Sequence, residues 1–471
     1  MVALIMAAAG TTKALGDSLN QESTSGAEII PLQPRPRIYT RSEHPISRKF
    51  IADSALKVLY RLNKAGYRAL LVGGSVRDLL LGHQPKDFDV ATDALPEQVR
   101  ELFRNCRLIG RRFRLAHVQF GSEIIEVATF RAAHDGDTDG AAMTDDGRIL
   151  RDNVYGTLDD DVWRRDFTVN ALYYDIANFS IVDYVGGVED LKANRLRLLG
   201  DPEKRFREDP VRMLRAVRFA TKLGFEIDAA TLAPINRLRH LLNDIAPARL
   251  FDEILKLFHG GFGRASFEIL RKYGLFHCLC PLTDQSLEGN EGAFVQQLLT
   301  AAFDNTDRRI ADGKPVTPAF LFAALLWQSM EDEAAANVAN GLNLLDAIQL
   351  AADTVISKQV ARIAIPRRFS NITREIWALQ PRLVKRTAKR APRLMEHPRF
   401  RAAYDFLLLR AQAGEPIQEA ADWWTQFIEA DDPSRSKLLE AAPPDAARPT
   451  RRRRRRGGSG RNRTPAPVTD G

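Results

Sequence analysis

The stretch from Leu70 to Ala94 constrains the fold most. In it a strand-like apolar run, a glycine turn and a short helical run lead into a pair of acids. Asp87 and Asp89 are separated by one residue in a second strand-like run. Side chains two apart in a strand point to the same face, so these carboxylates are expected side by side, about 6 to 7 Å apart. They repel each other unless a cation lies between them. Mg²⁺ is the expected cation where phosphates are the substrate.

The turn before the acids supplies the second half of a phosphate site. Gly73 and Gly74 allow backbone N–H groups to approach an anion closely, and the N-terminus of the following helix favours negative charge. A tight turn followed by two solvated acids is the simpler interpretation. The coupling of turn and acids favours a metal-assisted phosphate site.

A site with two metal ions generally needs a third acid. The sequence offers Glu126, in a strand-like run over 123–130, and Asp166, in a segment over 159–175 with helical spacing. On that expected helix Asp166 and Asn170 share a face, because they are four residues apart. Both acids stay open as the third ligand, since Asp166 is also suited to bind ribose hydroxyls.

Arginines lie close to these acids in the sequence. Arg164 and Arg165 offer planar donor groups for a triphosphate. The segment 208–219 predicts a helix with Pro210 in its first turn, on which Asp209 and Arg212 are able to pair with the edge of an incoming base. An amphipathic helix with an arginine face is the alternative for this segment. The arginines of that face are Arg212, Arg215 and Arg218.

The composition is that of an intracellular protein with several domains. A chain of 471 residues is long enough for two to four domains, and 45% of its residues are hydrophobic. Three cysteines exclude a disulfide framework and fit a reducing cytosol. Cys278 and Cys280 have no second pair nearby, which argues against zinc. The first nine residues are apolar but too few to span a membrane, so we expect a cytoplasmic protein without a membrane anchor.

The positive charge is concentrated at one end. Residues 446–471 contain nine arginines, no lysine and one acid, which equals the whole chain's net charge of +8. The other residues balance at 59 basic and 59 acidic. Such a run repels itself and does not fold alone, so we interpret it as a disordered arm that binds RNA. A solubility tail or a processing site is the alternative.

The predicted fold class is α+β. A small mixed sheet comes first, with a strand pair over 180–184 and 195–199 closing its domain and a mobile loop over 132–156 beside the site. From residue 201 the spacing is helical nearly to the end. The expected regions are a flexible segment over 1–45, a head over 46–200, a helical neck over 201–260, an all-α body and RNA-binding region over 261–445, and the basic tail over 446–471.

Taken together, these motifs resemble a known family. The order VGGSVRD, DFD, EVATFR, RRDFTVNA and EDPVRMLRAVRF is similar to the class II nucleotidyltransferases, which include tRNA CCA-adding enzymes and bacterial poly(A) polymerases. The resemblance covers about residues 45 to 260. The segment LIGRRFRLAHV, over 108–118, is similar to the one that marks the poly(A) polymerase branch.

The resemblance implies a role for each matched residue. Asp87 and Asp89 would bind the catalytic Mg²⁺ ions, and Asp166 and Asn170 would lie against the sugar, with Asp166 close enough to complete the carboxylate cluster. The remaining nucleotide-binding candidates are Gly73, Gly74, Ser75, Arg77, Asp78, Arg165, Asp209, Arg212 and Arg215. The RNA-binding candidates are Arg111, Arg112, Arg451, Arg452, Arg453, Arg454, Arg455 and Arg456.

The implied activity is the template-independent addition of AMP from ATP to RNA 3′ ends, which promotes RNA turnover. We expect a monomer whose partners are RNA, ATP and proteins of RNA decay. The nearest alternative is a CCA-adding enzyme, which shares every catalytic motif. A non-catalytic RNA-binding protein on the same fold is a third hypothesis, against which the intact acids argue.

Overall fold

An eight-stranded mixed sheet organises the first part of the chain. The computed structural model describes residues 35–110, 114–132, 141–143, 149–152, 154–387 and 390–441. The strand order is β1-β10-β9-β2-β3-β6-β5-β4, and all neighbours are antiparallel except β3 and β6. The strands are β1 (Arg37–Tyr39), β2 (Ala69–Val72), β3 (Asp89–Thr92), β4 (Cys106–Ile109), β5 (Leu115–Phe120), β6 (Glu123–Thr129), β9 (Leu172–Asp175) and β10 (Ser180–Asp183).

Both faces of the central strands are buried, as the apolar sequence of β2 requires. Leu71 belongs to the large core on one face, whereas Leu70 and Val72 belong to a smaller core on the other. Helix α1 (Asp53–Lys64) packs on the first face through an apolar stripe. Four more α-helices of the described residues belong to the head: α2 (Gly74–Leu80), α3 (Pro96–Leu102), α4 (Leu158–Arg164) and α5 (Gly187–Lys192).

The predicted helix over 159–175 is wrong for its second half. Helix α4 (Leu158–Arg164) ends early, a 3₁₀ turn covers Thr168–Asn170, and the last residues form strand β9. Leu172, Tyr173 and Tyr174 are buried between β2 and β10. Pairing on both sides therefore overrides the helical spacing, since aromatic residues pack well in a sheet.

Three further expectations differ from the structure. The runs over 180–184 and 195–199 do not pair: β10 lies between β1 and β9, and β11 (Arg195–Leu196) pairs with β12 (Glu226–Ile227). Residues 37–39 of the expected flexible segment form edge strand β1, because the exposed edge of β10 accepts it. Asp87 precedes β3 instead of lying in it.

A small hairpin occupies part of the expected loop over 132–156. It consists of β7 (Ala141–Met143) and β8 (Ile149–Asp152), which pair antiparallel. The expected mobility of residues 133–140, 144–148 and 153 lies outside the described residues.

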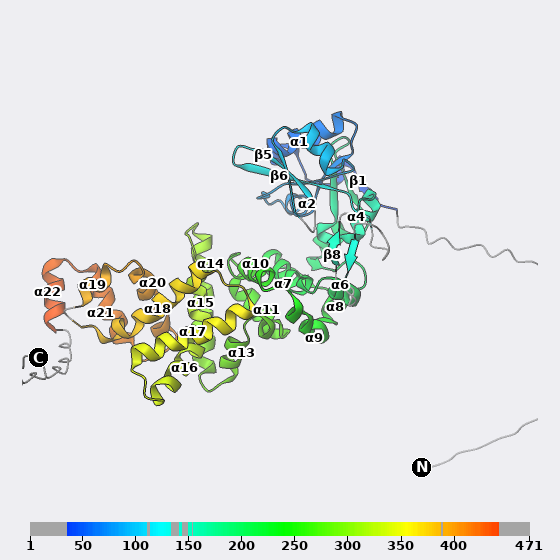
Figure 1. Ribbon diagram of the computed structural model, residues 1–471. Helices are drawn as coiled ribbons and strands as arrows, with labels where there is room; N and C mark the ends of the chain where they lie inside the picture. The colour runs from blue at the N-terminus through cyan, green and yellow to red at the C-terminus, as the bar shows by residue number, and fades with distance from the viewer. Residues whose placement is uncertain are drawn as a thin grey trace, which may run out of the picture.

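The rest of the described chain is helical except for β12, which confirms the expected all-α second half. Figure 1 shows these helices extending away from the head as an elongated body. The first are α6 (Pro202–Glu208), α7 (Val211–Leu223), α8 (Ala229–Leu232), α9 (Ile235–Leu238), α10 (Pro247–Phe258), α11 (Gly263–Lys272), α12 (Leu275–Leu279) and α13 (Pro281–Glu288). The others are α14 (Gly292–Ala311), α15 (Pro318–Leu325), α16 (Trp327–Ala339), α17 (Leu344–Arg362), α18 (Arg367–Lys385), α19 (Ala391–Met395), α20 (Phe400–Gln412), α21 (Gln418–Glu429) and α22 (Asp432–Ala441).

Helix α7 connects the head to the helical body. Its apolar side, which includes Met213, Leu214 and Val217, is buried as predicted. It packs on α10 and α11, and Phe219 meets Phe167 of the head with ring centroids 5.6 Å apart. Among the described residues, no helix has the length and apolar character needed to cross a membrane.

Candidate active site

Three acids gather where β3 begins. Asp89 is the first residue of β3, and the parallel register pairs it with Glu126 of β6. Asp87 lies two residues earlier and is exposed. Burial, followed by the negative charge of Glu126, raises the pKa of Asp89 to about 6; Asp87 adds to this effect and Arg165 opposes it. The carboxylates therefore carry charge that nearby cations only partly compensate.

The structure distinguishes the two candidates for a third acid. Glu126 is the neighbour of Asp89 across the sheet and reaches His117 of β5 at 3.1 Å. Asp166 instead is engaged by the neck helix α7 through Arg215. The parallel pairing of β3 with β6 thus brings Glu126 beside Asp89, and the charge of Glu126 acts on Asp89.

These acids fit Mg²⁺ by the chemistry of their donors. Divalent magnesium prefers carboxylate oxygens, and a cation here would offset the burial and the repulsion by Glu126 that raise the pKa of Asp89. Within the described ranges, no three His, Cys, Asp or Glu side chains already converge as a set of metal ligands. A bound phosphate and small side-chain rotations would have to complete the coordination.

The raised pKa of Asp89 predicts a pH-dependent stability. Above about pH 6 the folded protein holds this carboxylate charged against its preference, so Asp89→Asn should stabilise the metal-free protein by about 2 kcal/mol near pH 8. As the pH falls toward 4, Asp89 becomes protonated in the folded state and the difference should disappear. Thermal unfolding in the presence of a chelator measures the stability difference between wild type and variant near pH 8 and near pH 4. Added Mg²⁺ should raise the Tm of the wild type more than that of the variant; equal shifts would contradict the metal assignment.

The glycine turn lies against a fixed arginine. Gly73 has φ 70° and ψ −128°, a backbone conformation that favours glycine. A Cβ atom at Gly73 would lie 3.5 Å from Nη1 of Arg165. The hydroxyl of Ser75 is buried and donates to the carbonyl oxygen of Val72 at 3.0 Å, so Ser75 holds the turn in shape and does not offer this proton to a phosphate.

Arg77, an expected triphosphate ligand, is only 2% exposed. Its Nε donates to Asp78 at 2.8 Å, and its Nη1 donates to Oδ1 of Asn170 at 2.6 Å. The Nε and Nη1 donors of Arg77 are therefore both engaged by other residues of the protein. Arg77 and Asp78 hold Asn170 in place behind the turn.

Arg165 lies against the turn at Gly73, as Arg77 does at Gly74, where a Cβ atom would lie 3.5 Å from Nη2 of Arg77. Its Nη2 donates to Asp161 at 2.8 Å and its Nε donates to the hydroxyl of Tyr173 at 2.6 Å, while that hydroxyl donates to Asp161 at 2.7 Å. Burial alone would lower the pKa of Arg165, but Tyr173 and Asp161 more than offset it and the pKa is raised. The guanidinium is thus permanently charged and held in one orientation.

Asp166 joins the head to the neck. Its carboxylate accepts from the backbone N of Phe167 at 2.8 Å, from Nδ2 of Asn170 at 3.1 Å and from Nε of Arg215 at 2.9 Å. Burial alone would raise the pKa of Asp166, but the Arg215 guanidinium and these hydrogen bonds hold it well below its usual range. The expected contact between Asp166 and Asn170 is confirmed, although a 3₁₀ turn makes it and not a helix.

The two candidate base readers are both held by neighbours. Asp209 precedes α7 and accepts from Nη2 of Arg249 at 2.6 Å. Arg212 is buried and donates from Nη1 to Glu208 at 2.9 Å and to the carbonyl oxygen of Arg205 at 2.7 Å. No motif in the sequence around Arg249, which lies on α10, indicated that it would bind Asp209.

Two other residues of the site were missed in the sequence. Asp161 and Tyr173 hold Arg165, and the alternation of a strand over 172–175 would have put Tyr173 on the face toward α4. The candidate residues Arg111, Arg112 and Arg451–Arg456 lie outside the described residues.

Family models match most of the chain. "Poly A polymerase head domain" matches residues 69–197, "Probable RNA and SrmB-binding site of polymerase A" matches 224–287, and "Polymerase A arginine-rich C-terminus" matches 340–458. The solved CCA-adding enzyme of Bacillus stearothermophilus in complex with CTP is similar, with 28% identity and a TM-score of 0.55 over 81% of this chain and 83% of that one. The Thermotoga maritima CCA-adding enzyme, 19% identical, has the same fold at a TM-score of 0.55 over 87% and 91% of the two chains.

The mixed sheet, its acid pair and these matches define a nucleotidyltransferase. Poly(A) polymerase I of Salmonella typhimurium is 51% identical over 90% of this chain and 92% of its own, and that of Haemophilus influenzae is 46% identical over 85% and 89%. The chain belongs to the poly(A) polymerase I family. A CCA-adding enzyme of Lactobacillus helveticus is 42% identical, but over 46% of this chain and 52% of its own.

Proposed function

We propose that the protein adds AMP from ATP to RNA 3′ ends without a template. The observation that carries this proposal is that Asp89 and Glu126 are paired across β3 and β6. Arg165 lies against the glycine turn at Gly73, which follows β2. The 51% identity to poly(A) polymerase I of Salmonella typhimurium over nine-tenths of the chain supports the proposal, because the sequence match to the CCA-adding enzyme of Lactobacillus helveticus is 42% and covers about half.

The proposed reaction is an in-line displacement at the α-phosphorus of ATP, in which the RNA 3′-hydroxyl loses its proton and forms a phosphodiester bond while the α–β bond breaks and pyrophosphate leaves. Mg²⁺ held by Asp87, Asp89 and Glu126 would neutralise the phosphates and acidify the hydroxyl. Gly73 leaves room for the triphosphate, and the charged Arg165 orients it. No side-chain nucleophile is required, since positioning and charge neutralisation supply most of the effect.

The neighbours of the nucleotide have separate proposed tasks. Asn170, aligned by Arg77, would contact the sugar together with Asp166. Asp209 and Arg212 are each tied to another side chain, so they offer a fixed surface to the base. A fixed surface suits one base better than two, and we propose that this base is adenine.

A primer-extension assay tests the proposed activity. Purified protein with Mg²⁺ is given either a generic RNA with a free 3′-hydroxyl or a tRNA that lacks its CCA end, with ATP alone or CTP alone. We expect long extension of the generic RNA with ATP. Short extension that requires CTP and is confined to the tRNA would show a CCA-adding enzyme instead.

We propose that the arginine run of the C-terminal tail binds RNA. Changing Arg451–Arg456 to glycine should weaken RNA affinity and flatten its salt dependence by about 0.7 log unit for each phosphate that the tail no longer neutralises. Fluorescence anisotropy with single-stranded RNA over a salt series measures both quantities. Changing Pro465 and Pro467 to glycine alters the same tail without removing charge and should change neither. An unaltered salt slope in the arginine variant would exclude this role.

We further propose a monomeric enzyme that acts in the cytoplasm and meets proteins of RNA decay. Its three cysteines, Cys106, Cys278 and Cys280, are all free, which fits a reducing compartment.

A further inference from the structure

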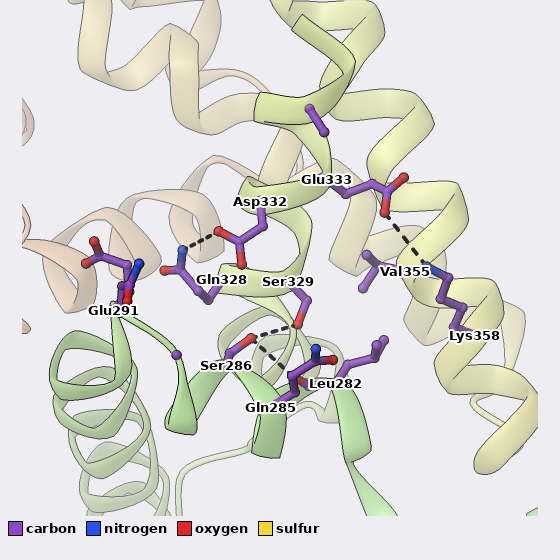
Figure 2. Close-up of a pocket in the computed structure, with 13 residues that line it drawn as sticks. Leu282, Gln285, Ser286, Glu291, Gln328, Ser329, Asp332, Glu333, Val355 and Lys358 are labelled. Carbon is purple, nitrogen blue, oxygen red and sulfur yellow. Dashed lines mark hydrogen bonds and ion pairs between the residues drawn. The ribbon is translucent and has the colours of Figure 1, made fainter. Parts of the chain in front are cut away.

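Two cavities in the helical body lie away from the catalytic acids and differ in charge. The larger, about 680 Å³, opens between α13, α16 and α17 (Figure 2). Its lining includes Glu291, Asp332 and Glu333 against one cation, Lys358, which Glu333 approaches at 3.8 Å. Gln328 donates to Asp332 at 2.8 Å. This cavity therefore carries more acidic than basic side chains and repels polyanions.

The second cavity is cationic. It has a volume of about 570 Å³ and lies where the start of α17 meets the end of α18 and the short helix α19. Its lining contains four basic side chains and no carboxylate: Arg382, Lys385, Arg390 and Arg393. Among the described residues, Arg382, Lys385 and Arg393 have no ion-pair partner. The cavity, here called the α17–α18 groove, therefore carries positive charge at Arg382, Lys385 and Arg393 that no described carboxylate pairs with.

An exposed apolar pair lies in the same groove. Leu344 is 45% exposed and Leu345 is 50% exposed, and both are in the first turn of α17. Two adjacent leucines left half in water inside a concave site are typical of a surface that a partner covers. Burying them further would add favourable free energy in proportion to the apolar area.

The lining favours a peptide over RNA. Single-stranded RNA binds through phosphate contacts together with bases stacked on aromatic rings. No phenylalanine, tyrosine or tryptophan lines the groove, and its apolar contacts come from leucines and Pro381. An amphipathic helix that presents leucine-type side chains flanked by carboxylates would match both the leucine pair and the basic rim.

We propose that the α17–α18 groove is a docking site for an acidic peptide segment of another protein, with apolar side chains that cover Leu344 and Leu345. Carboxylates of the segment pair with Arg382, Lys385 and Arg393. Charged contacts at the rim set the orientation and the association rate, and the leucine contacts supply the affinity. This docking is independent of the nucleotidyl transfer site.

Fluorescence polarisation with the full chain tests the proposal. The probe is a labelled synthetic helical peptide of about fifteen residues, with leucines at i, i+4 and i+7 and glutamates beside them. We expect Leu344→Ser with Leu345→Ser, and separately Arg382→Glu with Arg393→Glu, each to weaken peptide binding about tenfold or more. A second probe, oligo(A), reports RNA affinity, which the leucine variant should leave unchanged.

Matched controls lie on the same two helices. Leu350→Ser removes an equally exposed leucine of α17 outside the groove, and Arg367→Glu reverses an exposed charge at the other end of α18. Both should bind the peptide as the wild type does, and all variants should keep the wild-type Tm. If the leucine variant binds peptide normally while the charge-reversal variant loses oligo(A), the groove is an RNA contact and the proposal is overturned. Failure of the wild type to bind the leucine peptide more tightly than its serine analogue would also overturn it.

Discussion

Replacing Asp89 with asparagine is expected to abolish AMP transfer while RNA binding stays intact. The negative charges of both Asp87 and Glu126 act on Asp89, and its carboxylate is the most buried of the three proposed metal ligands. An amide oxygen carries no net charge, so the metal loses several kcal/mol of stabilisation, which corresponds to a decrease of about a thousandfold or more in kcat. Single-turnover primer extension with saturating ATP measures the loss, and anisotropy with the same RNA measures binding.

Two further variants make this result specific. Glu126→Gln should lose activity to a similar order, because Glu126 is paired with Asp89 across the sheet. Glu123→Gln, at the exposed start of the same strand β6, should retain it. Full activity in the Asp89 or the Glu126 variant would contradict the three-acid site, and loss of RNA binding in the Asp89 variant would indicate a folding defect.

Removing the guanidinium of Arg215 is expected to lower the free energy of unfolding, because this group joins the neck helix α7 to Asp166 of the head. Arg215→Met leaves the buried Asp166 carboxylate without its ion-pair partner. Breaking a buried pair in this way costs about 3 to 5 kcal/mol, and we expect the lower end because the Arg215 side chain is 32% exposed. Denaturant unfolding monitored by intrinsic fluorescence gives the free energy of unfolding.

A double variant separates the loss of the ion pair from the cost of an unpaired buried charge. Asp166→Asn combined with Arg215→Met removes both charges, so it should recover much of the stability while ATP turnover stays impaired. Arg237→Ala breaks the exposed ion pair with Glu203 and should cost less than about 1 kcal/mol. If Arg215→Met lowers the free energy of unfolding no more than Arg237→Ala does, the contact between Asp166 and Arg215 does not join the domains.

The pH dependence of this contact has a definite sign. Because the pKa of Asp166 is lowered in the folded protein, its ion pair stabilises the fold above the ordinary carboxylate pKa and is lost as the pH falls below about 4. The Asp89 effect runs in the opposite direction, since its pKa is raised. Stability lost below about pH 4 therefore probes Asp166, whereas the change of stability between about pH 4 and 6 probes Asp89.

Local sequence determined the elements of the site. The apolar run over 69–72, the glycines after it and the helical spacing that follows were sufficient for β2, the turn and α2. The helical second half was equally readable, because amphipathic spacing and breaks at glycine and proline are local signals. The order of the motifs also indicated the protein family, and the matches to poly(A) polymerase I confirm that prediction.

Only the tertiary structure decided how these elements meet. Strand β9 forms because β2 and β10 bury both its edges and its aromatic side chains, although its sequence also fits a helix. Glu126 reaches Asp89 through the parallel pairing of β3 and β6, and Arg77 turns inward because Asn170 and Asp78 take its donors. The physical reason is that spacing along a chain reports which face a residue occupies. Which partner covers that face depends on contacts between segments far apart in sequence.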